Sequence, residues 1–385
     1  MPAIYMDNAA TTYPKPDSVY RAVDHFNRNM GGNPGRGSSQ QSIEAGSVIL
    51  QTREALARFF NIKDSLDIAF TANVTESLNI GLKGLLRHGD HVITSSMEHN
   101  AVARPLYALR RHGIEWTQVA CAADGSLDPQ DIARAIKPNT RMICTLHASN
   151  VTGTILPIRE IGRLAREAGI IYMVDSAQSA GVLPIDVQAD AIDILAFAGH
   201  KGLFGPQGTG GLYIHPDIKV QPLKEGGTGS LSEHLEQPDF MPDMLESGTL
   251  NTPGIAGLGA GIAFVSQQGI DRIRQHEREL LVQLIDGLQQ IKGIRLYGPL
   301  DPQRQTAVLA FNVEGLDCGE LSSQLDYEYG IITRAGMHCA PLAHQTIGSD
   351  ISGSCRLSPG YFNTRAEIDH VLQAIEKLSG SNEAG

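Results

Sequence analysis

Short apolar runs alternate with amphipathic segments over the first two thirds of the chain. The runs are rich in β-branched residues, and the segments at 128–136 and 158–168 between them have helical periodicity. Strands that alternate with helices are typical of a parallel sheet covered on both faces. The sequence therefore predicts an α/β fold with strands at 91–94, 114–119, 141–147, 170–174 and 193–197.

The last third of the chain has a different pattern, with a long helical stretch from about Gly254 to Gln290. The segments that follow it predict strands at 306–313 and 331–333 and helices at 317–327 and 365–378. This order is typical of an α+β unit. We expect a large domain over 15–255 and a small domain that combines 1–14 with 256–385.

The strand at 193–197 is the most informative, because it delivers His200 and Lys201 at its C-terminal end, followed by a glycine-rich loop at 205–211. Open α/β sheets bind their ligands at the carboxyl ends of the strands. A lysine that serves only as a solvated surface residue does not need to be positioned by a buried strand, so a surface role explains Lys201 poorly. We interpret Lys201 as a Schiff-base lysine for pyridoxal 5'-phosphate.

Two other strand ends supply groups that this cofactor requires. The strand at 170–174 ends in Asp175, whose carboxylate can pair with the pyridine nitrogen. An N-cap role would explain Asp175 alone, but its spacing to Lys201 favours the cofactor role. A third strand end leads into a helix that starts near Thr75, where free N–H groups can bind phosphate. Thr75 is either only a cap or a cap that also donates to phosphate.

Short motifs with polar or glycine residues occur along nearly the whole chain, at 7–12, 75–77, 98–100, 149–153, 175–178, 199–201 and 334–341. Each motif is short, but their occurrence in this order is specific, and together they resemble a cysteine desulfurase of the class V aminotransferase family. The resemblance implies a pyridoxal phosphate-dependent transferase of fold type I, with a mainly parallel seven-stranded sheet in the large domain, a smaller α+β domain and a homodimer.

The resemblance also implies the role of each cofactor residue. Lys201 would bind the cofactor and move the substrate α-proton, and His99 would stack on the ring. Asp175 would hold the ring nitrogen, and Gln178 would bond to the phenolic oxygen. The phosphate contacts would be Val74, Thr75 and His200, together with Thr249, which would reach the phosphate of the partner subunit.

The same resemblance implies a substrate site. Arg356 would bind the substrate carboxylate, and its guanidinium has the planar fork that a carboxylate requires. A structural ion pair is the alternative for a lone arginine. Asn150 would lie near the carboxylate, with Asn8 and Ala9 also in the substrate site.

The chain has five cysteines, and an odd number without a secretory signal indicates reduced thiols in a cytoplasmic protein. Cys339 follows His338 in a loop flanked by glycine and proline, where a neighbouring His or Arg lowers a thiol pKa. The resemblance implies that Cys339 attacks the sulfur of L-cysteine, releases alanine and passes its persulfide to a protein acceptor. The other cysteines are expected to be buried: Cys121, Cys144, Cys318 and Cys355.

Composition excludes some classes of function. A net charge of -11 and a pI near 5.6 argue against a nonspecific nucleic-acid binder. No apolar stretch reaches the roughly 20 residues that span a membrane, and the start lacks the pattern of a signal peptide. We expect a soluble, cytoplasmic protein. No metal site is expected, because the acidic residues between Glu225 and Asp243 resemble a solvated segment.

Two positions depart from the family pattern: Ala198 replaces a usual phosphate-donating hydroxyl residue, and the segment after Lys201 is one residue longer. Three functions stay open. The first is a cysteine desulfurase that supplies sulfur for iron-sulfur cluster assembly or tRNA modification. The second is a selenocysteine lyase or another C–S lyase on the same scaffold. The third is a catalytically silent sulfur carrier or assembly partner. The sequence does not decide between L-cysteine and L-selenocysteine, nor does it identify the acceptor.

Overall fold

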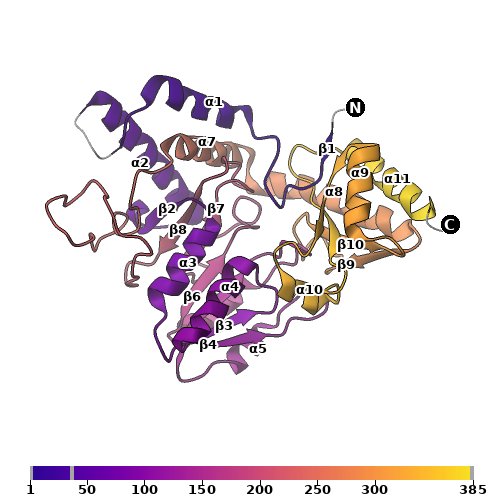
Figure 1. Cartoon of the computed structure of the whole chain (residues 1–385), viewed down its shortest axis with the longest axis horizontal. Helices are drawn as coiled ribbons and strands as arrows, with labels where there is room; N and C mark the ends of the chain where they lie inside the picture. The colour runs from indigo at the N-terminus through magenta and orange to yellow at the C-terminus, as the bar shows by residue number, and fades with distance from the viewer. Residues whose placement is uncertain (1–2, 35–38, 382–385) are drawn as a thin grey trace.

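The computed structural model describes residues 3–34 and 39–381. Figure 1 shows a larger unit around one sheet and a smaller unit that contains the end of the chain and lies beside it. In the described part of the chain, no helix combines the length and the apolar character that a membrane span requires.

A seven-stranded sheet forms the centre of the larger unit. All neighbouring strands run parallel except β8, which is antiparallel to both of its neighbours. This arrangement confirms the predicted α/β fold with a mainly parallel sheet. From one edge to the other, the order is β2 (Ile68–Thr71), β8 (Gly210–Ile214), β7 (Ile194–Ala198), β6 (Ile171–Asp175), β5 (Thr140–Leu146), β3 (His91–Ser95) and β4 (Glu115–Val119).

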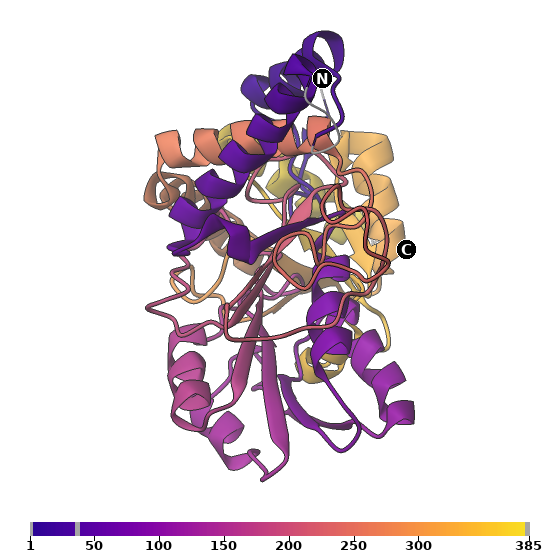
Figure 2. The same ribbon diagram turned by 90° about the vertical axis from the view of Figure 1, so that its left-hand side faces the viewer.

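Helices cover both faces of this sheet, and Figure 2 shows the strands in profile between them. Alternate residues of one strand point to opposite faces, so Ile194 and Leu195 of β7 belong to different cores. This burial on both faces explains why the strand reads as a continuous apolar run. One face is covered by α3 (Val74–Leu85) and α4 (Asn100–Leu109), and the other by α2 (Gln40–Phe60), α5 (Pro129–Arg134), α6 (Ile158–Glu167) and α7 (Thr252–Gln268).

The predicted glycine-rich loop at 205–211 is too long, because Gly210 and Gly211 begin strand β8. Gly211 packs directly against the ring of Phe197 in β7. A Cβ atom at Gly211 would come 2.2 Å from a ring carbon, so only glycine allows the two strands to approach here. Gly211 therefore serves packing within the sheet, while Gly210 lies against the backbone of Asn73 before α3.

The predicted continuous helix from Gly254 to Gln290 is wrong, because Gly269 interrupts it and two helices form. Gly269 has a φ of +82°, which a helix interior does not allow, and it separates α7 from α8 (Ile270–Gln290). Helix α7 packs against α2 and against α1 (Asp17–His25) in the larger unit.

The smaller unit has its own core and a four-stranded antiparallel sheet, in agreement with the predicted α+β pattern. The N-terminal strand β1 (Ile4–Tyr5) pairs with β11 (Ile331–Ile332), so the start of the chain contacts this unit. The domain boundaries themselves remain a prediction. The sheet contains β12 (Arg334–Gly336), β13 (Ser354–Leu357), β10 (Leu309–Val313) and β9 (Ile294–Tyr297), and the helices are α8, α9 (Cys318–Tyr329), α10 (Pro341–Ile347) and α11 (Arg365–Ser381).

Glu277 on α8 makes stability depend on pH. Its side chain is only 9% exposed, and burial raises its pKa from about 4.5 to about 8. The folded protein therefore keeps a proton that the unfolded chain releases. The free energy of unfolding should fall as pH rises from about 4.5 to about 8, by up to about 1.4 kcal/mol per pH unit.

Glu277→Gln should remove this part of the pH dependence. Urea unfolding measured between about pH 5 and about pH 9 would show a smaller loss of stability in the variant than in the wild type. Glu376→Gln, at an exposed position of α11, is the matched control. An identical pH dependence in wild type and Glu277→Gln would contradict the prediction.

Candidate active site

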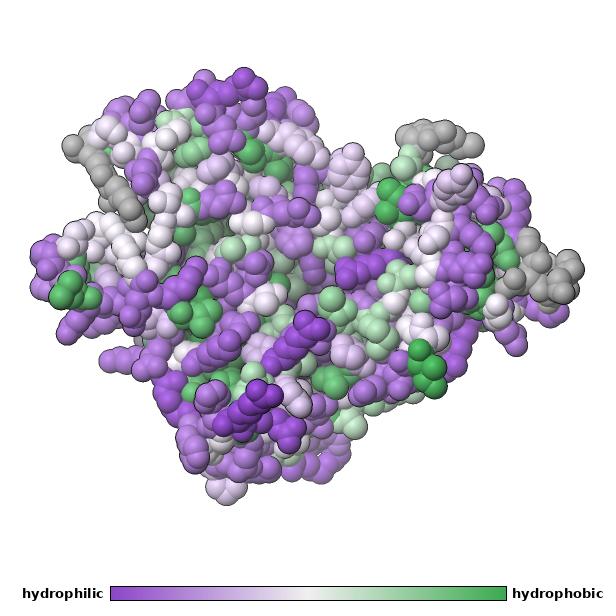
Figure 3. Space-filling view, viewed as in Figure 1, coloured by the Kyte–Doolittle hydropathy of each residue, from purple (hydrophilic) through white to green (hydrophobic). Residues whose placement is uncertain are grey.

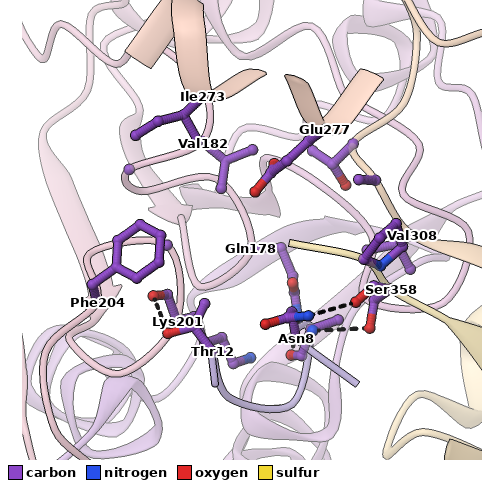
Figure 4. Close-up of a pocket in the computed structure, with 16 residues that line it drawn as sticks. Asn8, Thr12, Gln178, Val182, Lys201, Phe204, Ile273, Glu277, Val308 and Ser358 are labelled. Carbon is purple, nitrogen blue, oxygen red and sulfur yellow. Dashed lines mark hydrogen bonds between the residues drawn. The ribbon is translucent and has the colours of Figure 1, made fainter. Parts of the chain in front are cut away.

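Lys201 follows β7 at the carboxyl edge of the large sheet, in a pocket between the two units. Figure 4 shows Lys201, Thr12 and Phe204 on one side of this pocket. Asn8 and Ser358 lie on the opposite side, and the Glu277 carboxyl points in from α8. Gln178 and Ala9 also line this pocket, so it brings together four predicted residues: Lys201, Gln178, Asn8 and Ala9.

The N-terminal segment holds the peptide that carries Lys201. The Thr12 hydroxyl donates to the Lys201 carbonyl at 3.1 Å, and the backbone N–H of Thr12 donates to the His200 carbonyl at 3.2 Å. Lys15 Nζ donates to the same His200 carbonyl at 2.7 Å and to the Thr12 hydroxyl at 2.6 Å. Burial lowers the pKa of Lys15 to about 7. The sequence carries no signal for Lys15, because both partners are neutral groups and the His200 carbonyl is 185 residues away along the chain.

Burial lowers the pKa of Lys201 to about 8, although the nearby Asp175 carboxylate acts in the opposite direction. More of the amine is therefore neutral near pH 7 than in an ordinary lysine. A neutral amine is the form that attacks a carbonyl or accepts a proton, so this environment suits the predicted Schiff-base role.

Asp175 is the last residue of β6 and is buried. Burial raises the pKa of its carboxyl, and the N–H of Ala177 donates to Oδ1 at 2.9 Å. The N-cap role considered as the alternative for Asp175 is therefore present only as a contact within a turn, because no α-helix begins at Asp175. No other donor among the described residues contacts this carboxyl, so it can accept a further bond.

His99 precedes α4 and caps it, since its Nδ1 accepts the N–H of Ala101 at 3.0 Å. A nitrogen that accepts a backbone N–H carries no proton, so the ring proton lies on Nε2. Burial, followed by the charge of Lys201, lowers the pKa of His99 to about 4. The imidazole is therefore neutral near pH 7, as expected of a ring that stacks on a cofactor.

The start of α3 offers an anion site, but the cap is Asn73 and not Thr75. Asn73 Oδ1 accepts the N–H of Glu76 at 3.0 Å, and the Glu76 carboxylate accepts the N–H of Ala72 at 2.7 Å. Within the described residues no acceptor contacts the N–H groups of Val74 and Thr75. These free donors at a helix N-terminus can bind phosphate.

Two other predicted phosphate contacts are less direct. His200 has a buried Nδ1 without a hydrogen-bond partner in the described part of the chain, and burial lowers its pKa to about 4. Thr249 is exposed and lies outside the pocket of its own Lys201. Ala198 is buried at the end of β7, where its methyl group offers no donor.

Arg356 on β13 is 1% exposed, and one of its three guanidinium nitrogens has no hydrogen-bond partner among the described residues. Its Nη1 donates to the Asn150 carbonyl at 2.8 Å, and its Nη2 contacts Asp7 Oδ1 at 2.5 Å. The ion pair weighed as an alternative is therefore real, and its partner is Asp7. However, Nε is buried and contacts no acceptor among the described residues. A substrate carboxylate would satisfy this N–H group.

Cys339 is exposed and lies in the loop between β12 and α10, where its neighbours His338 and Ala340 are buried. His338 and Cys339 have φ values of 47° and 58°, in the left-handed region that side chains rarely adopt. The loop is fixed at both residues, since Asn150 Nδ2 donates to the His338 carbonyl at 2.7 Å and the N–H of Asn100 donates to the Cys339 carbonyl at 2.8 Å.

Arg334, and not His338, is the cation that faces the Cys339 thiol. Its Nη2 lies 3.8 Å from Sγ. His338 instead contacts the Ser354 carbonyl through Nε2 at 3.0 Å, and burial lowers its pKa to about 2, so its ring is neutral. The remaining cysteines are not exposed: Cys144, Cys318 and Cys355 are buried, and Cys121 is half-buried.

Comparison with known proteins identifies the family of the chain. The aminotransferase class-V family model matches residues 4–371. The chain belongs to the class-V aminotransferase family. Its relatives in this family include a probable cysteine desulfurase of Methanothermobacter thermautotrophicus, 37% identical over 98% of this chain and 95% of that protein. A cysteine desulfurase of Yersinia pseudotuberculosis is 36% identical over 98% of this chain and 95% of its own length.

Solved structures of cysteine desulfurases have the same fold. The apo cysteine desulfurase of Thermococcus onnurineus NA1 has a TM-score of 0.92 and 32% identity, and covers 98% of this chain and 95% of its own. The Escherichia coli cysteine desulfurase CsdA has a TM-score of 0.87 and 29% identity, and covers 97% and 94%. These matches confirm the resemblance to cysteine desulfurases and the type I fold.

Class-V aminotransferases of this kind use pyridoxal phosphate, which confirms the predicted cofactor. The residues present fit that group. Lys201 provides an amine with a lowered pKa, and Asp175 provides a buried carboxyl that can accept a further bond. The free N–H groups at the start of α3 and the unpaired Nδ1 of His200 suit a phosphate.

The Schiff base should form on Lys201. After incubation with pyridoxal phosphate, borohydride reduction and digestion, mass spectrometry should find the pyridoxyl group on the peptide that contains Lys201. Lys201→Ala should carry no label, because Lys201 is the only lysine among the described residues that lines this pocket. Lys63→Ala, at an exposed position, should be labelled like the wild type. A label on Lys15 in place of Lys201 would refute the assignment.

Proposed function

We propose that the protein is a cysteine desulfurase that converts L-cysteine to L-alanine and holds the sulfur as a persulfide on Cys339. The contacts of Asn150 carry this proposal. Its carbonyl accepts a hydrogen bond from Arg356, and its side-chain amide donates to the His338 carbonyl, beside Cys339. One residue therefore connects the group that suits a substrate carboxylate with the loop that presents the thiol.

The substrate would bind through its carboxylate. Arg356 has a buried Nε donor to offer, and Asp7 keeps the guanidinium in place from the opposite side. Asn150 Oδ1 is also buried and has no partner among the described residues, so it can accept from a bound ligand. The charge of Arg356 also contributes to the lowered pKa of Lys201.

Pyridoxal phosphate, when bound at Lys201, supplies an electron sink for the charge that develops at the substrate Cα. Asp175 would hold its ring nitrogen, Gln178 its phenolic oxygen, and His99 its ring face. The Lys201 amine, with a pKa near 8, can take a proton from Cα and return it close to neutral pH. The phosphate would be held by Val74, Thr75 and His200.

Cys339 would then act on the substrate sulfur. Its thiolate attacks Sγ, a new S–S bond forms on Cys339 and the C–S bond breaks, so that alanine is released after a proton reaches its Cβ. The exposure of Cys339 allows the persulfide to meet an acceptor protein. The cation of Arg334 lies beside the thiol while this exchange takes place.

We also propose a homodimer in which Thr249 of one subunit reaches the phosphate site of the other. In its favour, Thr249 is exposed and lies away from its own Lys201. A soluble, cytoplasmic protein that passes sulfur to a protein acceptor, for example in iron-sulfur cluster assembly, fits this function. Neither a nucleic acid nor a membrane is expected as its partner.

The alternatives are less well supported. A selenocysteine lyase or another C–S lyase would use the same scaffold without Cys339, whereas here the thiol is exposed beside the substrate residues and the relatives are named cysteine desulfurase. A silent sulfur carrier would not need Lys201, Asp175, His99 and Arg356 together.

Alanine formation from L-cysteine tests the proposal. With pyridoxal phosphate and a thiol reductant, Cys339→Ala should form alanine at least about a hundredfold more slowly than the wild type, because it lacks the nucleophile. Cys121→Ala, at a half-buried position outside the site, should retain activity. Alanine formation that survives in Cys339→Ala would indicate a C–S lyase, and turnover of L-selenocysteine alone would indicate a selenocysteine lyase.

A further inference from the structure

Helix α4 and the turn after it carry a row of exposed cations. Arg104, Tyr107 and Arg111 are spaced three and four residues apart, so they share one side of the helix. Arg110 lies over the Tyr107 ring, with its guanidinium carbon 5.9 Å from the ring centre. Figure 3 shows strongly hydrophilic side chains along α4. We name Arg104, Tyr107, Arg110 and Arg111 the arginine stripe.

The arginine stripe has no acidic partner in the described part of the chain. None of its three arginines forms an ion pair there, and the nearby Glu115 instead pairs with Lys137 at 3.0 Å. Like charges on one helix face destabilise it by a few tenths of a kcal/mol, so folding gains nothing from this arrangement. In a chain of net charge -11, an unpaired cationic surface indicates a negatively charged partner.

Helix α4, which carries the start of the arginine stripe, begins next to Cys339. The first residue of α4, Asn100, donates its N–H to the Cys339 carbonyl at 2.8 Å. With a rise of about 1.5 Å per residue, Arg104 lies about 6 Å from Asn100 along the helix axis, and Arg111, in the turn after α4, lies about 16 Å from it. An extended segment advances about 3.3 Å per residue. In a partner protein whose cysteine thiol contacts Cys339, the residues that contact the arginine stripe would therefore lie about two to five positions from that cysteine in the partner's sequence.

We propose that the arginine stripe docks an acidic segment of the protein that takes the sulfur from Cys339. This inference rests on the proposed function. A tyrosine among arginines is the composition of protein-binding hot spots, and the acidic remainder of the chain repels a nucleic-acid backbone. Complementary charge would speed the encounter and align the acceptor thiol with the persulfide.

The transfer itself needs no further reagent. The thiolate of the acceptor attacks the outer sulfur of the persulfide, a new S–S bond forms on the acceptor, and the bond to Cys339 breaks. Cys339 leaves as a thiolate and takes up the proton that the acceptor thiol lost. The number of disulfide-type bonds is unchanged, so no oxidant or reductant is consumed.

A labelled peptide tests the proposal. It carries one cysteine and glutamates two to five residues from it, and a matched peptide carries glutamines in their place. Fluorescence anisotropy should show that Arg110→Glu/Arg111→Glu binds the glutamate peptide about tenfold more weakly than the wild type. Lys63→Glu/Arg272→Glu changes the net charge equally at exposed positions after α2 and on α8, and its binding should stay within about twofold.

Sulfur transfer gives a second readout. Mass spectrometry should find the glutamate peptide persulfidated about tenfold more slowly by Arg110→Glu/Arg111→Glu, while alanine formation with dithiothreitol stays within about twofold of the wild type. A wild type that forms no alanine would overturn the proposed function, and this inference with it. With alanine forming, three results would overturn the docking site alone: equal binding of the two peptides, no effect of the double substitution, or tighter binding of a single-stranded RNA oligonucleotide.

Discussion

The parallel register of β5, β6 and β7 is the constraint on which the active site depends. Leu146 lies opposite Asp175, and Asp175 lies opposite Ala196, so β5 and β6 end at one level and β7 ends two residues further along the same edge. The residues that follow these ends, among them Asn150 and Lys201, are therefore delivered to one edge of the sheet. A shift of one residue in either pairing would turn Asp175 toward the opposite face of the sheet.

Burial at this edge then sets the charge of each group. Lys201 has a lowered pKa because its ammonium is removed from water, and His99 is neutral for the same reason. Asp175 has a raised pKa in isolation, and a positively charged ring nitrogen would provide the partner that it lacks. The site is thus poorly solvated and has donors and acceptors that are complete only with a ligand, as is expected of a preorganised active site.

The N-terminal segment connects the two units through this site. Asp7 pairs with Arg356 of the smaller unit, while Thr12 and Lys15 hold the His200–Lys201 peptide of the larger one. Residues within one short segment therefore hold both the arginine that would bind the substrate carboxylate and the lysine that would bind the cofactor. From the other side, the loop of Cys339 is fixed by Asn150, so thiol and substrate site share one network of hydrogen bonds.

The sequence by itself determined the parts that depend on local pattern. The strands at 91–94, 141–147 and 193–197 could be recognised because their apolar residues are contiguous, and the motifs around Lys201 and Cys339 because they are short and ordered along the chain. Tertiary structure alone decided the rest. Asp7 and Arg356 are 349 positions apart, and Lys15 and His200 are 185 positions apart, so no local window of the sequence contains either pair. The sequence also did not predict the strand β8, because Gly210 and Gly211 resemble part of a loop, whereas Gly211 is required by its close approach to the Phe197 ring of the neighbouring strand.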